Sequence, residues 1–192
     1  MKINTLIAFA IVSLCLLSTV FANESKLLDE KKNATTKIVN SNSNFGMEFY
    51  SKIVRENKGK NVFFSPYSLT TALAMAWAGA DGETQTEISK VLGFDGLNEK
   101  EVHESISKLA SELRSENGKM KLSIANAVWA DRKANVNVKF SQLMDKKYKS
   151  KFSTLDFFSD AGEACKTIND WVEKNTEGKI KELLTCLLYT SP

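Results

Sequence analysis

Few residues in this sequence have side chains suited to catalysis or metal binding. The 192 residues include one histidine, His103, and three cysteines, Cys15, Cys165 and Cys186. A catalytic nucleophile needs a neighbouring base, and the sequence has neither a Gly-x-Ser-x-Gly elbow nor a glycine-rich phosphate loop. One histidine and widely separated cysteines cannot complete a zinc site, and the carboxylates lack the spacing of a calcium loop. The sequence therefore predicts neither an enzyme nor a bound metal or cofactor.

The first 22 residues have the pattern of a secretory signal peptide. Lys2 precedes an apolar run over residues 6–17, and Val20 and Ala22 suit the cleavage site of signal peptidase. An uncleaved membrane anchor is the alternative, but the run only just approaches the length that spans a bilayer. We expect cleavage after Ala22, which gives a secreted mature chain that starts at Asn23 and is not held at a membrane.

The mature chain keeps two cysteines, Cys165 and Cys186, in what would be an oxidising compartment. A disulfide between them is chemically possible, but two cysteines do not define a disulfide framework. The residues around Cys165 have helical periodicity, and a free cysteine on a helix commonly fills buried apolar space. We expect Cys165 to have this role.

Residues 23–43 are predicted to form a flexible polar leader. This stretch contains the glycosylation sequon Asn33-Ala34-Thr35, and a second sequon at Asn23 lies against the cleavage site. We expect a glycan on Asn33. Removal of Lys2 with the signal leaves 25 basic and 23 acidic residues, a net charge of +2. This balance does not call for nucleic acid or an acidic membrane as a partner.

Hydrophobic periodicity defines the elements that would position these residues. An amphipathic helix is predicted over residues 44–58, and Asn61–Phe64 has the composition of a short buried strand. Ser65 and Pro66 then supply a helix N-cap and the residue favoured at the first helical position. The helix that follows, to about residue 78, has no charged face and is too short for a membrane, so it belongs in a protein core.

The rest of the chain alternates between helix and strand signals. Helices are predicted over residues 84–92, 99–113, around Phe140 and over 160–177, and strands over 120–129 and 151–158. The period of the first strand places Asn126 on the side of its apolar residues, where a buried amide needs hydrogen-bond partners. We expect Asn126 to be a core amide with its hydrogen bonds satisfied.

Four sequence blocks in a fixed order resemble the serpin family, and the match as a whole runs from about residue 44 to residue 184. The blocks are Asn61–Leu69 with Ala72–Met75 and Gly79-Ala80; Gly82–Thr84 with Glu87-Ile88; Leu122–Trp129; and Ile168–Glu173 with Thr176–Ile180. The first block is similar to the family's buried strand with its central helix, the third to a long strand of the main sheet, and the fourth to the helix across that sheet. Four blocks in family order leave little room for coincidence.

The resemblance implies an α+β serpin fold, with three β-sheets surrounded by helices and incomplete in this chain. In that family a protease cleaves an exposed reactive loop, which then inserts into the main sheet. The sheet opens over the start of the central helix, so Ser65 and Ser68 match the family's shutter positions, and Asn126 has a mechanical role only second to packing. Helix capping alone would also explain Ser65, and a first-turn position would explain Ser68.

The resemblance implies a secreted serpin that inhibits a target serine protease and is a monomer. A non-inhibitory serpin acting as a carrier, chaperone or storage protein is the alternative, because the hinge and reactive loop that separate the two lie outside this sequence. The family pattern stops at Leu184 and residues 185–192 depart from it. We therefore expect a C-terminally truncated N-terminal portion that cannot inhibit and that, because its strands are unpaired, aggregates or stays partly molten.

A heparin-like polyanion is a weaker expectation for a partner. The stretch that corresponds to the basic helix of heparin-responsive serpins contains four basic residues, Lys108, Arg114, Lys119 and Lys121. It also contains four acidic residues, Glu101, Glu104, Glu112 and Glu116. A solvated face of mixed charge therefore explains this stretch better than a polyanion site does.

Overall fold

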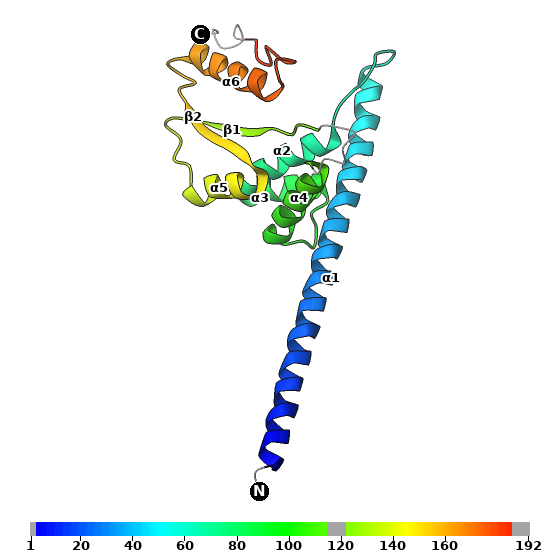
Figure 1. The fold of residues 1–192 in the computed structure, drawn as a ribbon. Coiled ribbons are helices and arrows are strands. Elements are labelled where there is room, and N and C mark those ends of the chain that lie inside the picture. Colours follow the sequence, from blue (N-terminus) through cyan, green and yellow to red (C-terminus); the bar gives the residue numbers. More distant parts are fainter. Residues whose placement is uncertain (1–2, 115–121, 186–192) are drawn as a thin grey trace.

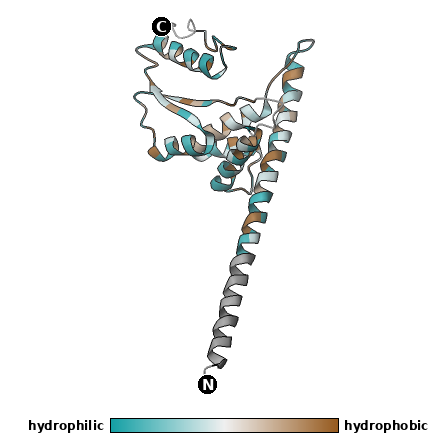
Figure 2. Ribbon diagram, viewed as in Figure 1, coloured by the Kyte–Doolittle hydropathy of each residue, from teal (hydrophilic) through white to brown (hydrophobic). Residues whose placement is uncertain are grey.

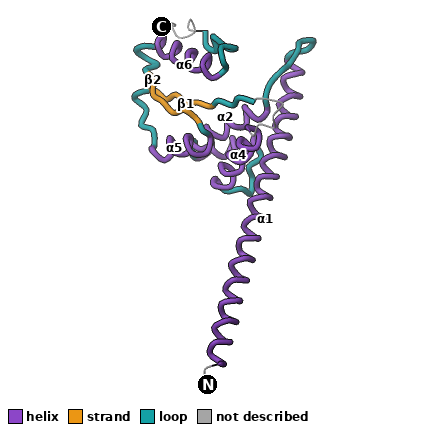
Figure 3. Tube along the Cα trace, in the orientation of Figure 1, coloured by secondary structure: helices purple, strands orange, loops and turns teal. Residues whose placement is uncertain are grey.

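The computed structural model describes the backbone of residues 3–114 and 122–185, and the side chains within these ranges from residue 23 on. The elements in chain order are α1 (Ile3–Glu56), α2 (Pro66–Gly79), α3 (Gly82–Leu92), α4 (Glu99–Arg114), β1 (Asn126–Asp131), α5 (Val138–Leu143), the π-helical turn η1 (Met144–Tyr148), β2 (Ser150–Leu155) and α6 (Ala161–Asn175). Helices dominate this part of the chain, as Figure 3 shows. No helix among the described residues has the length and hydropathy needed to cross a bilayer.

The long helix α1 differs most from the sequence prediction. Residues 23–43, expected to be a flexible leader, are helical and continue without a break into the predicted amphipathic helix. The physical reason is burial, because Ala34 and Ile38 lie one turn apart and are only 4% and 1% exposed. They extend the stripe that Phe45 and Phe49 form further along the same helix, and this stripe packs against α2, α3 and α4.

The hydrophobic core lies where α1, α2, α3 and α4 meet, close to η1. Its buried members are Ile38, Phe45, Ala74, Met75, Trp77, Leu92, Phe94, Val102, Ile106, Met144 and Tyr148. Figure 2 shows hydrophobic residues gathered where α2 and α4 pack beside α1. Helix α2 buries one side in this core, whereas Ala72 and Ala76 on its other side are exposed. The absence of charge on α2 thus reflects one buried face and one small-residue face.

The sheet is smaller than the sequence predicted. Strands β1 and β2 pair in parallel, from Asn126 with Ser150 to Asp131 with Leu155. Of the strand expected at residues 120–129, residues 126–129 lie in β1, residues 122–125 form no strand, and residues 120–121 lie outside the described residues. Residues 61–64 form no strand because they have no partner strand among the described residues. Phe63 is fully exposed there. Strand pairing needs a neighbour, which the local sequence does not supply.

Helix α6 and the other helices contact opposite faces of the sheet. Successive side chains of a strand point to opposite faces, and Val128 packs against the helical core while Trp129 contacts Trp171 of α6. The two indole rings meet edge to face, with centroids 5.1 Å apart. Figure 1 shows α6 on the side of the strands away from α2. The alternation predicted for this strand is therefore observed.

Candidate functional site

The N-terminus of α2 carries the two serines singled out from the sequence. Ser65 has an extended backbone, with φ −109° and ψ 108°, and its Oγ accepts a hydrogen bond from the Ser68 backbone N–H at 3.2 Å. The Ser68 hydroxyl donates to the same Oγ at 3.0 Å. Pro66 follows the cap and needs no hydrogen-bond acceptor for its nitrogen. The sequence Ser-Pro-x-Ser therefore starts the helix and links both hydroxyls.

The chain before this cap is fixed by aromatic packing. The Phe64 ring contacts Phe49 edge to face at 5.2 Å and stacks with Tyr50 at 6.4 Å, so the end of α1 holds the entry to α2. Ser65 and Ser68 themselves are exposed. The Ser65 hydroxyl can still donate its hydrogen and the Ser68 oxygen can still accept, so both can hydrogen-bond with a backbone segment laid over them.

Asn126 lies elsewhere, at the first residue of β1. Its side chain is half-buried, and its Nδ2 donates a hydrogen bond to the Tyr148 carbonyl oxygen at 3.2 Å. The amide therefore has the hydrogen-bond partner that the sequence predicted it would need. No hydrogen bond joins it to Ser65 or Ser68 among the described residues, so the structure brings together the two serines but not the third position.

Buried polar groups on α2 lack hydrogen-bond partners in the described part of the chain. They are the Tyr67 hydroxyl, the Thr70 and Thr71 hydroxyls and the Trp77 indole N–H. Leaving such a group unsatisfied typically costs about 1 to 3 kcal/mol. The central helix therefore carries hydrogen-bonding capacity that the described residues do not use.

A buried histidine is the polar feature that sequence reasoning missed. His103 lies in the helix predicted over residues 99–113 and was considered only for catalysis and metal binding, yet it is only 4% exposed, and its Nδ1 lies 2.6 Å from the Tyr148 hydroxyl oxygen. Burial lowers the pKa of His103 to about 4, opposed by the nearby Glu99 and assisted by Lys147. Burial likewise raises the pKa of Tyr148. His103 lies at helical spacing from the buried Ile106 and Ala110, so the apolar periodicity of α4 could have indicated that His103 is buried.

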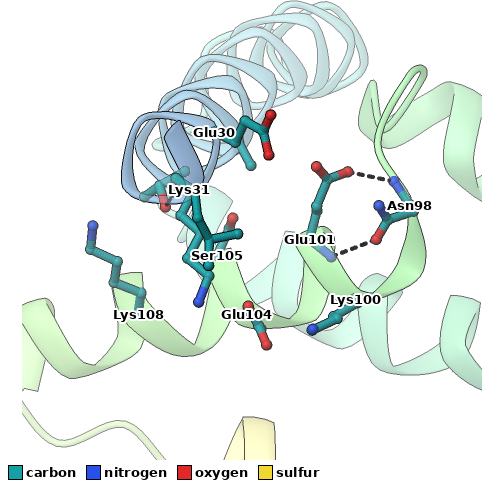
Figure 4. Close-up of a pocket in the computed structure, with 11 residues that line it drawn as sticks. Glu30, Lys31, Asn98, Lys100, Glu101, Glu104, Ser105 and Lys108 are labelled. Atoms are coloured by element: carbon teal, nitrogen blue, oxygen red, sulfur yellow. Dashed lines mark hydrogen bonds between the residues drawn. The ribbon is translucent and has the colours of Figure 1, made fainter. Parts of the chain in front are cut away.

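A pocket of about 340 Å³ lies between α1 and the start of α4 (Figure 4). Lys31 and Glu30 enter it from α1, and the other lining residues labelled in Figure 4 come from α4 and its N-cap. Asn98 and Glu101 form a reciprocal capping box, with the N–H of each donating to the side chain of the other. The lining mixes lysines and glutamates, so the pocket offers no single charge to a ligand.

The basic residues considered for polyanion binding do not form one group in the structure. Lys108 lines the pocket beside α1, whereas Arg114 donates a hydrogen bond to the Ile124 carbonyl oxygen at 3.3 Å. Lys119 and Lys121 lie outside the described residues. Glu104 forms an ion pair with Lys147 at 3.7 Å, and this pairing belongs to the mixed-charge face expected from the sequence.

Cys165 is buried, with 1% exposure, but it is not the free apolar filler that the sequence favoured. It is disulfide-bonded, and its partner lies outside the described side chains. In the part of the chain with described side chains, no three His, Cys, Asp or Glu residues are grouped so that they could hold a metal ion. The Nδ1 atom of His103 is already hydrogen-bonded to the Tyr148 hydroxyl.

The two sequon asparagines are both accessible. Asn33 and Asn23 lie exposed on α1, and the Thr35 hydroxyl of the first sequon donates to the Lys31 carbonyl oxygen at 3.0 Å. Ala34, which lies between Asn33 and Thr35 in the sequon, is buried against the core. A glycan on Asn33 would therefore project away from the packed face of the helix.

Comparison with protein families gives one match over most of the chain. The model described as "Serpin (serine protease inhibitor)" matches residues 40–190, so it starts before residue 44 and extends past Leu184, the two limits expected from the sequence. A leukocyte elastase inhibitor of Xenopus tropicalis is 37% identical over 144 residues, covering 74% of this chain and 38% of that protein. An alpha-1-antiproteinase of Bos taurus is 36% identical, covering 80% of this chain and 37% of that protein.

Solved structures give the same result for the fold. Reactive-loop-cleaved human thyroxine binding globulin superposes with a TM-score of 0.72 at 31% identity, covering 79% of this chain and 45% of that one. Cleaved kallistatin, complexed with heparin, superposes with a TM-score of 0.70 at 32% identity, covering 76% and 43%. The chain thus spans about two fifths of the length of the relatives it matches.

Proposed function

Because this chain belongs to the serpin family, we propose that the full-length protein is a secreted inhibitor of a serine-type endopeptidase. The proposed mechanism is insertion of a cleaved reactive loop into the main sheet. The reactive loop lies outside these 192 residues in this proposal, so the chain by itself does not inhibit. The observation that carries the proposal is the similarity over three quarters of the chain to a protein named as an elastase inhibitor.

The geometry of α2 supports the proposed shutter. Ser65 and Ser68 are hydrogen-bonded to each other and exposed, and the helix behind them carries four buried polar groups without partners among the described residues. Strands laid over the start of this helix could hydrogen-bond with the exposed Ser65 and Ser68 hydroxyls and would lie where a sheet has to open. The role of Asn126 is weaker, because its amide is occupied by the Tyr148 carbonyl oxygen.

Secretion, glycosylation and cleavage after Ala22 are parts of the same proposal. The disulfide at Cys165 supports an oxidising compartment, because structural disulfides are rare in the cytosol. Exposure of Asn33 supports a glycan at that position. A polyanion partner on α4 has less support: one similar structure is a heparin complex, but in this chain lysines and glutamates alternate around the α1–α4 pocket.

A non-inhibitory serpin is the second candidate function. One of the similar structures is named thyroxine binding globulin, so its name describes ligand binding rather than protease inhibition. The part of the chain described here would serve either function, since the proposed hinge and reactive loop are outside it.

The test is incubation of the purified full-length protein with elastase-, trypsin- and chymotrypsin-type proteases, followed by denaturing electrophoresis. Inhibition by loop insertion predicts a detergent-stable complex with one protease class and a higher unfolding temperature after loop cleavage, because stored strain is released. Residues 23–184 alone serve as the control and should give no complex. Cleavage without a complex and without added thermal stability would support the carrier function instead.

A further inference from the structure

The carboxamide of Asn169 on α6 hydrogen-bonds to the backbone of the chain that follows the helix. Its Oδ1 accepts hydrogen bonds from the backbone N–H groups of Leu183 at 3.0 Å and Leu184 at 2.9 Å. Its Nδ2 donates to the Leu184 carbonyl oxygen at 2.9 Å. The Asn169 side chain is 9% exposed, so these bonds are largely shielded from water. One amide thus makes three hydrogen bonds to the backbone of two adjacent residues.

Residues 179–184, called here the return segment, run back beside α6 after a tight reversal (Figure 1). The reversal uses positive φ angles at Glu177 and Gly178, and the Ile180 N–H then donates to the Thr176 hydroxyl at 3.0 Å. Within the described residues, Lys179 is the only member of the return segment with a backbone-to-backbone hydrogen bond. Side chains of α6 and its C-cap supply further hydrogen bonds to Ile180, Leu183 and Leu184.

Apolar packing adds little to this attachment. Ile180 is 43% exposed and Leu183 is 58% exposed, so neither buries most of its side chain against α6. Asn169 lies one helical turn after Cys165, whose Sγ is 3.6 Å from the Leu184 carbonyl oxygen. The end of the return segment thus covers the buried face of α6, and Asn169 is its principal polar contact.

We propose that Asn169 is a positioning residue that clamps the return segment to α6 and sets how often residues 179–184 leave the helix. Opening of the clamp breaks the three hydrogen bonds to Leu183 and Leu184, and it releases a segment that carries Ile180, Leu183 and Leu184. Such a segment can pair with another strand edge. The clamp does not depend on the proposed inhibitory function, since it would act equally in a carrier.

The test is amide hydrogen exchange of the full-length protein, measured by mass spectrometry on peptides covering residues 176–185 and 122–132. Asn169→Leu keeps a similar volume and removes all three hydrogen bonds, and we expect exchange of residues 180–184 to become at least tenfold faster. Exchange in β1 should not change. Asn175→Leu is the matched control, because the Asn175 carboxamide bonds only to the Trp171 carbonyl oxygen of its own helix.

A second variant covers the case in which Asn169→Leu does not fold. Asn169→Asp keeps an oxygen that accepts from Leu183 and Leu184 but loses the donor to the Leu184 carbonyl, so exchange should rise by an intermediate factor. Trypsin should also cut faster after Lys179 and Lys181, both exposed, in either variant. Unchanged exchange of residues 180–184 in a folded variant, or an equal rise in β1 or in the Asn175→Leu control, would overturn the clamp. Protease complexes are not a readout of this test, so its failure is separate from failure of the proposed inhibition.

Discussion

The imidazole Nδ1 of His103 lies 2.6 Å from the hydroxyl oxygen of Tyr148, at the junction of α4 with η1. Trp77 of α2 also contacts His103, and the centroids of the two rings are 5.5 Å apart. One neutral histidine therefore links three elements of the core, and its protonation would place a charge where burial strongly disfavours one.

This junction predicts acid sensitivity. The pKa of His103 is about 4 in the folded protein, against an ordinary value of 6.5. Between these two pH values the unfolded state therefore binds a proton on His103 and the folded state does not. The free energy of unfolding should be unaffected by His103 above about pH 6.5 and should decrease as the pH falls toward 4, by up to about 3 kcal/mol. Denaturant titrations of the full-length protein between pH 4 and 7 measure this dependence. His103→Phe should show a shallower slope, and an unchanged slope would show that His103 is not the responsible group.

The cap of α2 predicts different effects for its two serines. Ser65→Ala removes the acceptor for both the Ser68 N–H and the Ser68 hydroxyl, so the free energy of unfolding should fall by about 1 kcal/mol. Ser68→Ala leaves the cap in place and should cost less than half of that. If the proposed shutter exists, Ser68→Ala should still change the rate of complex formation with the target protease. An effect on stability and rate in the same proportion for both serines would support capping alone.

A close approach of α1 to α2 predicts that a side chain at Gly46 would lower the free energy of unfolding. A Cβ atom on Gly46 would lie 2.9 Å from Cβ and from Cγ of Pro66, and these ring atoms cannot rotate away. Gly46→Ala should therefore destabilise the protein by about 1 to 2 kcal/mol despite the better helix propensity of alanine. Gly162→Ala in α6 is the control, since nothing lies within 4 Å of the added atom, and it should be neutral or slightly stabilising. Equal unfolding midpoints for the two variants would contradict the close approach.

The exposed sequon predicts one N-linked glycan. The secreted protein should migrate faster on a gel after enzymatic removal of N-linked sugars, and Asn33→Gln should reduce that difference by the size of one glycan. Asn23→Gln should leave the difference unchanged. The same difference in Asn33→Gln as in the unsubstituted protein would contradict a glycan on Asn33.

Local signals in the sequence predicted helices well where caps and stripes were present. Ser65 and Pro66 set the start of α2 correctly, and α4 lies within one residue of its expected end. The start of α3 was predicted at residue 84, but the helix begins at Gly82 with Asp81 as its cap. In α4 the apolar Leu113 is 38% exposed, whereas His103 is buried, because position on the helix face outweighs side-chain polarity.

Strands and non-local contacts could not be predicted in the same way. A strand at residues 61–64 or 122–125 depends on a pairing neighbour, which local composition does not reveal. The helical state of residues 23–43 depends on Ala34 and Ile38 meeting α4, a contact hidden by the polar residues around them. The clamp by Asn169 joins positions 14 and 15 residues apart and leaves no sequence pattern.

The edge-to-face pair of Trp129 and Trp171 gives the protein a built-in optical reporter. It is the ring contact that joins the sheet to α6, and the remaining tryptophan of the chain, Trp77, is buried on the far side of β1. Separation of α6 from β1 would expose two indoles to water together and end their coupling, while Trp77 keeps its surroundings. Near-ultraviolet circular dichroism and tryptophan emission can therefore follow the movement of α6 in real time without any attached dye.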